Sequence, residues 1–65
     1  MKSYLINAQG KKEVQKIVDL NCEILAMYPG NLLISCTKNQ YQSIRRIGVD
    51  YHWNVLENRQ SGGLN

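Results

Sequence analysis

The chain has 65 residues, of which 43% are apolar, and its formal net charge is +3. A chain of this length has room for one domain with a small core, and its apolar fraction excludes an intrinsically disordered segment. No apolar run reaches the roughly 20 residues that a membrane-crossing helix needs, so we expect no membrane span.

The first half of the sequence predicts a strand, a helix and a second strand. Residues 4–8 form a short strand that ends before Gln9-Gly10. From Lys11 onward, apolar residues recur at helical spacing, and Asn21 suits the left-handed conformation that often follows the end of a helix. Residues 22–27, Cys-Glu-Ile-Leu-Ala-Met, then form the second strand.

A tight turn and a third strand follow. The segment Tyr28-Pro29-Gly30-Asn31 favours a type II turn. Proline presets φ at the first central position of such a turn, and glycine accepts the positive φ of the second. The turn joins the second strand to a third strand at residues 32–36, so the two strands form a hairpin.

The second half predicts a helix and a fourth strand. Thr37 and Gln40 have the spacing of a capping box, in which each side chain bonds the backbone of the other residue. We expect this helix to end at Gly48, with three residues facing inward: Tyr41, Ile44 and Ile47. Residues 49–55 alternate between apolar and polar side chains, which predicts a half-buried strand.

The order β-α-β-β-α-β defines the expected fold class. It indicates an α+β domain of ferredoxin-like architecture, with a four-stranded antiparallel sheet and two helices on one face. Residues 1–56 make up this domain. Residues 57–65 contain Gly62-Gly63 and no apolar periodicity, so we expect them to form a flexible C-terminal tail.

The sheet face opposite the helices is predicted to be apolar. Alternation along the strands directs one set of residues toward the helices: Ile6, Ile24, Leu32, Ile34, Cys36, Val49 and Tyr51. The open face then receives four large apolar side chains: Leu5, Leu25, Met27 and Leu33. Such a patch usually marks an interface with a partner. A homodimer, or a β-bulge that shifts the parity of one strand, would also account for it.

The sequence carries no arrangement that indicates catalysis. His52 is the only histidine, and the five acids are scattered. Cys22 and Cys36 fit neither a zinc motif nor a redox motif, so we expect no metal and no cofactor. A disulfide between neighbouring strands is conceivable, but the lack of a signal-peptide pattern favours buried free thiols. We assign the basic charge to solvated helix faces, and we do not expect nucleic-acid binding, because the central strands offer only Tyr4 for stacking on bases.

Over residues 3–60 the sequence resembles the propeptide-inhibitor domains of subtilisin-like serine proteases, in particular the prodomains of spore-germination subtilases. Four segments carry the similarity: the opening Ser-Tyr-Leu-Ile strand, a helix that ends before Asn-Cys-Glu-Ile-Leu, the Pro-Gly-Asn-Leu-Leu-Ile-Ser hairpin, and Ile44-Arg-Arg-Ile-Gly-Val-Asp-Tyr-His-Trp. The last segment is similar to the Val-x-Tyr-Val-Glu ending of the family, although His52-Trp53-Asn54 replace its acids.

The resemblance implies a mechanism and a set of site residues. Domains of this family pack the open sheet face onto the protease and insert the C-terminal tail into the substrate cleft. They assist folding of the protease and then inhibit it. The implied sheet-face contacts are Leu5, Glu23, Leu25, Met27 and Leu33, and the implied cleft-filling residues are Asn58, Arg59, Gln60 and Ser61.

We therefore expect a protein without catalytic activity of its own, whose partner is a subtilisin-like serine protease. One alternative is a small regulatory or assembly module that self-associates through the same sheet face. Another is a basic nucleic-acid-binding domain. The expected location is cytoplasmic, unless the chain is excised from a larger secreted or spore-associated precursor.

Overall fold

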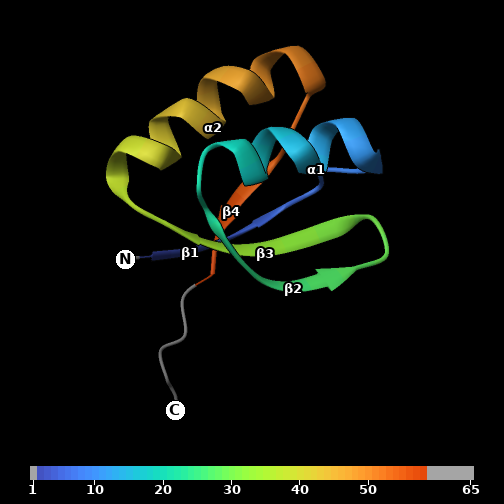
Figure 1. Cartoon of the computed structure of the whole chain (residues 1–65), viewed down its shortest axis with the longest axis horizontal. Helices are drawn as coiled ribbons and strands as arrows, with labels where there is room; N and C mark the ends of the chain where they lie inside the picture. Colours follow the sequence, from blue (N-terminus) through green and yellow to red (C-terminus); the bar gives the residue numbers. More distant parts are fainter. Residues whose placement is uncertain (1, 59–65) are drawn as a thin grey trace.

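The computed structural model describes residues 2–58. It contains four strands and two helices, shown in Figure 1: β1 (Lys2–Ile6), α1 (Gly10–Asp19), β2 (Glu23–Tyr28), β3 (Asn31–Cys36), α2 (Lys38–Tyr51) and β4 (Val55–Glu57).

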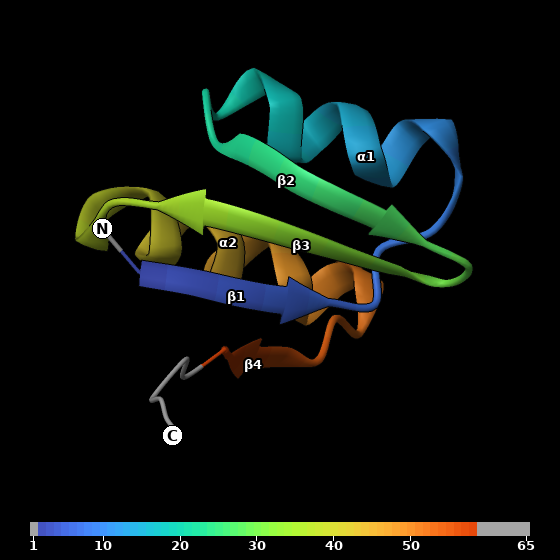
Figure 2. The ribbon, with the colours of Figure 1, turned by 90° about the horizontal axis from the view of Figure 1, so that it is seen from below.

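The strands form one antiparallel sheet in the order β2-β3-β1-β4. Both helices lie on the same face of this sheet, and no described helix covers the other face (Figures 1 and 2). β1 and β3 occupy the centre of the sheet. This arrangement confirms the predicted α+β, ferredoxin-like architecture.

The core lies between the sheet and the helices. The side chains without exposed surface come from both central strands and both helices: Ile6, Ile17, Ile34 and Ile44. Burying an aliphatic side chain of this size contributes about 1.5–3 kcal/mol. Tyr4 stacks on Tyr41 with ring centroids 4.5 Å apart, so β1 is packed against the first turns of α2. Alternate residues of β1 and β3 face the helices, as the sequence predicts.

The predicted turn and cap residues have the expected backbone geometry. Asn21 has a φ of 64° after α1, and Gly30 has a φ of 81° in the turn between β2 and β3. The Thr37 hydroxyl accepts a hydrogen bond from the Gln40 backbone N–H at 3.2 Å, and the Gln40 side chain accepts one from the Thr37 N–H at 2.8 Å. The capping box is therefore confirmed.

The end of α2 differs from the prediction. The helix continues past Gly48 to Tyr51, and His52 takes the left-handed position after it, with a φ of 59°. β4 is accordingly confined to residues 55–57, so the predicted strand over residues 49–55 is wrong. Gly48 and Tyr51 continue the helical spacing of the inward residues of α2, and tertiary contacts of both residues with Trp53 outweigh the short alternation.

The reason for a glycine at position 48 is close packing. Trp53 folds back over the helix, and a Cβ placed on Gly48 would lie 3.0 Å from the Cβ of Trp53. The Trp53 backbone N–H donates to the Gly48 carbonyl at 2.9 Å, and its indole N–H donates to Glu13 of α1 at 2.7 Å. Trp53 thus closes the end of α2 and ties it to α1.

Candidate docking face of the sheet

A row of apolar side chains crosses the open face of the sheet. Leu5 pairs with Leu33 between the central strands, and Leu56 of β4 pairs with Leu5 on the other side. Ala26 of β2 pairs with Leu33. The neighbours of Leu5 and Leu33 in sequence, Tyr4, Ile6, Leu32 and Ile34, are buried under the helices. The row Ala26–Leu33–Leu5–Leu56 therefore faces away from the helices.

A β-bulge changes the prediction for β2. The register shifts between Ile24 and Ala26, so that Ile24 pairs with Ile34 but Met27 pairs with Leu32. Since Leu32 faces the core, Met27 lies on the helix side of the sheet, where it lines a hollow with Val14 of α1. The predicted placement of Met27 on the open face is wrong, because one extra residue reverses the parity of everything that follows it.

The bulge also separates Leu25 from the regular ladder. Leu25 is 46% exposed and has no partner in the β2–β3 register. Glu23 precedes the bulge and pairs with Ser35, which has the same parity as Leu33. Glu23 is consequently the one charged residue that the described strand registers place on the open face.

Three residues of this face are not predicted by the sequence: Ala26, which follows the bulge, Tyr28 and Leu56. Tyr28 pairs with Asn31 at the hairpin end, and both Tyr28 and Leu56 are 53% exposed. The sequence predicts Tyr28 in the turn and Leu56 just after the fourth strand. The alternation of Leu56 with half-buried Val55 is the signal that indicates an outward position for Leu56.

The open face is hollowed beside the hairpin. The hollow has a volume of about 380 Å³ and is lined by Leu5, Tyr28, Asn31, Leu33 and Asn58. Its lining combines two leucines with a tyrosine and two side-chain amides. A site of this kind can receive an apolar side chain of a partner while the amides satisfy polar groups beside it.

The chain leaves the domain along the edge of this face. The Asn58 N–H donates to the Ser3 carbonyl at 2.8 Å, which continues the pairing of β4 with β1 by one bond. Lys2 and Glu57 form an ion pair of 3.7 Å at the same end of the sheet. Among the implied cleft-filling residues, Asn58 is described here, and Arg59, Gln60 and Ser61 lie outside the described residues.

The cysteines and the histidine lie away from the open face. Cys22 and Cys36 are buried free thiols in the core. Burial raises the pKa of Cys22, and burial together with the neighbouring Cys22 raises the pKa of Cys36 to about 11. His52 is exposed at the end of α2. None of these three residues is part of the apolar row on the open face.

Comparison with known protein families, with curated proteins and with solved structures found no match to this chain. Neither of the two described helices is long and apolar enough to cross a membrane.

Proposed function

We propose that the domain is a propeptide-like inhibitor and folding assistant of a subtilisin-like serine protease. The open sheet face docks on the protease, and the C-terminal tail enters the substrate cleft. The observation that supports this proposal most directly is the apolar row across all four strands, on a face that no described helix covers. An exposed row of this kind gains free energy when a partner removes it from water.

The size of the face favours a mechanism with two contacts. Three of the strands have five or six residues, which span about 17–20 Å, and β4 has three. Because neighbouring strands lie about 4.8 Å apart, the sheet presents a face of only a few hundred Å². A stable interface buries about 800 Å² on each partner. The sheet face therefore needs a second contact, and the tail that follows Asn58 begins at its edge.

An extended tail suits a protease cleft. A peptide in such a cleft is held as an added strand by main-chain hydrogen bonds, which require no particular side chains. Once the sheet face is docked, binding of the tail becomes intramolecular, and the combined affinity exceeds that of either contact alone. Glu23 supplies the charged contact on the sheet side.

Tail truncation tests the proposal. A chain that ends at Asn58 keeps β4 and its last backbone hydrogen bond, so we expect its unfolding midpoint to equal that of the full chain. Its inhibition constant against a bacterial subtilisin should rise at least tenfold, because the cleft contact is lost while the sheet contact remains. Steady-state hydrolysis of a chromogenic peptide measures both constants. Equal inhibition by the two chains would contradict the role of the tail.

Self-association through the same face is the second candidate. The exposed Leu56 and Tyr28 support it, since two copies could bury these side chains against each other. A dimer formed by two such faces would bury little area and would be weak at micromolar concentration. If the full chain fails to inhibit any subtilisin and sediments as a dimer, self-association replaces the inhibitor proposal.

A further inference from the structure

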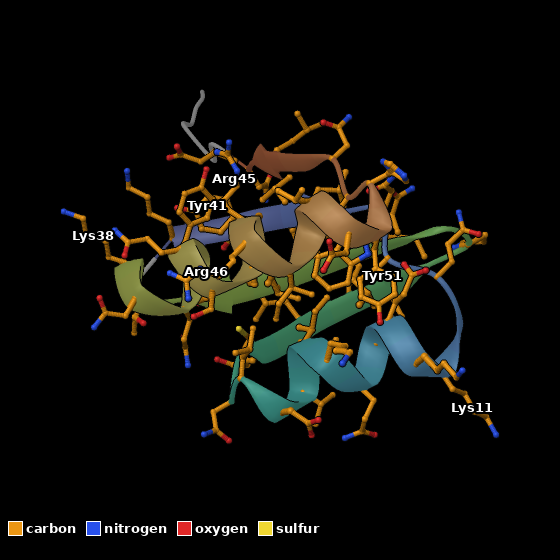
Figure 3. The ribbon with its side chains drawn as sticks, turned by 90° about the horizontal axis from the view of Figure 1, so that it is seen from above. Lys11, Lys38, Tyr41, Arg45, Arg46 and Tyr51 are labelled. Atoms are coloured by element: carbon orange, nitrogen blue, oxygen red, sulfur yellow. The ribbon has the colours of Figure 1, made fainter. Side chains whose placement is uncertain are left out.

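A groove between the two helices combines three lysines with an aromatic ring. It has a volume of about 550 Å³ and is lined by Lys11, Lys12 and Lys16 of α1 and by Tyr51 at the end of α2, together with Gln15 and Asp19. Figure 3 shows Lys11 and Tyr51 on the helix side of the molecule, away from the open sheet face.

The Tyr51 ring is held in place by packing against Trp53. It stacks on Trp53 with ring centroids 5.6 Å apart and an interplanar angle of 20°. Trp53 is itself fixed, because its indole N–H donates to Glu13 at 2.7 Å and its backbone N–H donates to the Gly48 carbonyl at 2.9 Å. The extension of α2 to Tyr51 therefore places a stacking platform beside the lysines of α1.

The groove is net positive, because its lining carries three lysines and one carboxylate, Asp19, which accepts a hydrogen bond from Gln15 at 2.8 Å. None of Lys11, Lys12 and Lys16 forms an ion pair with any residue of the described chain. Lys11 and Lys12 also stand in the first turn of α1, where the helix dipole disfavours a positive charge. Helix stability alone does not explain their position.

We propose that this groove binds single-stranded nucleic acid. The lysines contact backbone phosphates, and Tyr51 offers its ring to an unpaired base. Proteins that bind single strands without sequence preference combine a basic groove with aromatic rings in this way. An anionic lipid headgroup has no planar ring to stack on Tyr51, whereas a nucleic acid supplies phosphates and planar bases along one chain. The groove and the open sheet face lie on opposite sides, so the proposal is independent of protease binding.

Fluorescence anisotropy with a labelled oligothymidylate of about 12 nucleotides tests this proposal. Three phosphate contacts on a single strand predict that raising the salt from about 50 to 200 mM KCl weakens binding about 20-fold. Trp53 is the only tryptophan of the chain, so a base that stacks on Tyr51 should also change the intrinsic tryptophan fluorescence.

Variants separate the two parts of the site. Tyr51→Leu should weaken binding about fivefold or more at every salt concentration and leave the salt slope unchanged, whereas Tyr51→Phe keeps the ring and the affinity. The triple change of Lys11, Lys12 and Lys16 to Gln should abolish most of the salt dependence. Lys38→Gln removes one positive charge outside the groove and measures the loss of affinity that a single charge causes by itself.

The alternatives give different results. An equal loss of affinity per removed charge for Lys38→Gln and for the triple variant would assign binding to net charge and overturn the proposal. An unchanged affinity for Tyr51→Leu, with its fold verified by circular dichroism, would also overturn it. So would binding to vesicles that contain about 30% phosphatidylserine when the oligonucleotide does not bind, since anionic lipid would then be the ligand.

Discussion

Gly48 is a position where the backbone of α2 lies close to Trp53. Alanine in place of glycine stabilises a helix interior by about 1 kcal/mol in general. Here the new Cβ would lie 3.0 Å from the Cβ of Trp53, and two hydrogen bonds prevent Trp53 from moving away. We predict that Gly48→Ala lowers the free energy of unfolding by about 1–2 kcal/mol. Urea unfolding followed by circular dichroism measures the change.

Val49 provides the control for this prediction. It is 74% exposed and lies in the same turn of α2, so Val49→Ala raises helix propensity without a new contact. We expect it to be neutral or stabilising by up to about 0.5 kcal/mol. If Gly48→Ala is as stable as Val49→Ala, the proposed steric conflict with Trp53 does not exist.

Cys36 makes the stability of the domain depend on alkaline pH. Burial and the neighbouring Cys22 raise the pKa of its thiol from 9.0 to about 11 in the folded state. The folded chain thus holds the proton more tightly than the unfolded chain. This contribution to stability is complete below pH 9 and is lost as the pH rises to about 11. Its upper limit is about 2–3 kcal/mol.

The variant Cys36→Ala isolates this effect. It loses packing and is less stable than the parent chain at pH 7, but it lacks the titrating thiol. We therefore expect its unfolding free energy to fall less steeply between pH 9 and 11 than that of the parent chain. Parallel curves for the two chains over this range would show that the thiol does not contribute. Urea titrations at a series of pH values provide the data.

At the scale of single elements, β2 decides which residues reach the open face. Its bulge at Leu25 leaves Glu23 on that face, moves Met27 to the helix side and replaces it with Tyr28. α2 has a comparable role on the helix side. Its capping box begins the helix at Lys38, and the Gln40 amide also donates to the carbonyls of Leu20 and Asn21 at 2.9 and 3.2 Å. This contact fixes α2 relative to the end of α1.

At the scale of the whole molecule, one face of the sheet packs against the helices and forms the core, whereas the other face is open. Ile34 has no exposed surface and faces the core, whereas the adjacent Leu33 faces outward and is half-buried. We predict that Ile34→Asp unfolds the domain, because it places a charge among apolar side chains. Leu33→Asp should keep the fold, with a loss of about 1 kcal/mol, and should abolish inhibition of subtilisin or, in the alternative, self-association.

Two measurements decide the outcome for this pair. Circular dichroism reports whether each variant is folded, and inhibition assays together with sedimentation report whether the open face still binds. A Leu33→Asp chain that is folded and fully active as an inhibitor would remove the sheet face from the mechanism. Unfolding of both variants to the same extent would show that both side chains belong to the core.

Local patterns in the sequence were sufficient for the elements and their order. Alternation in β1 and β3, the Pro29-Gly30 turn and the Thr37–Gln40 capping box each depend on residues close together in the chain. They predicted the α+β architecture and placed Leu5 and Leu33 on the open face. Such features are governed by backbone propensities and by the periods of strands and helices, which a sequence displays directly.

Contacts between residues far apart in the sequence determined the end of α2 and the bulge in β2. The end of α2 depends on Trp53 packing against Gly48 and bonding to Glu13, 40 residues earlier in the chain. The bulge in β2 depends on its register with β3, which the alternation within β2 does not reveal. The same tertiary contacts move Tyr51 from a predicted strand to the groove beside the lysines of α1. Long-range packing therefore determined which side chains reach each surface, because it can override a local period at the ends of elements and at bulges.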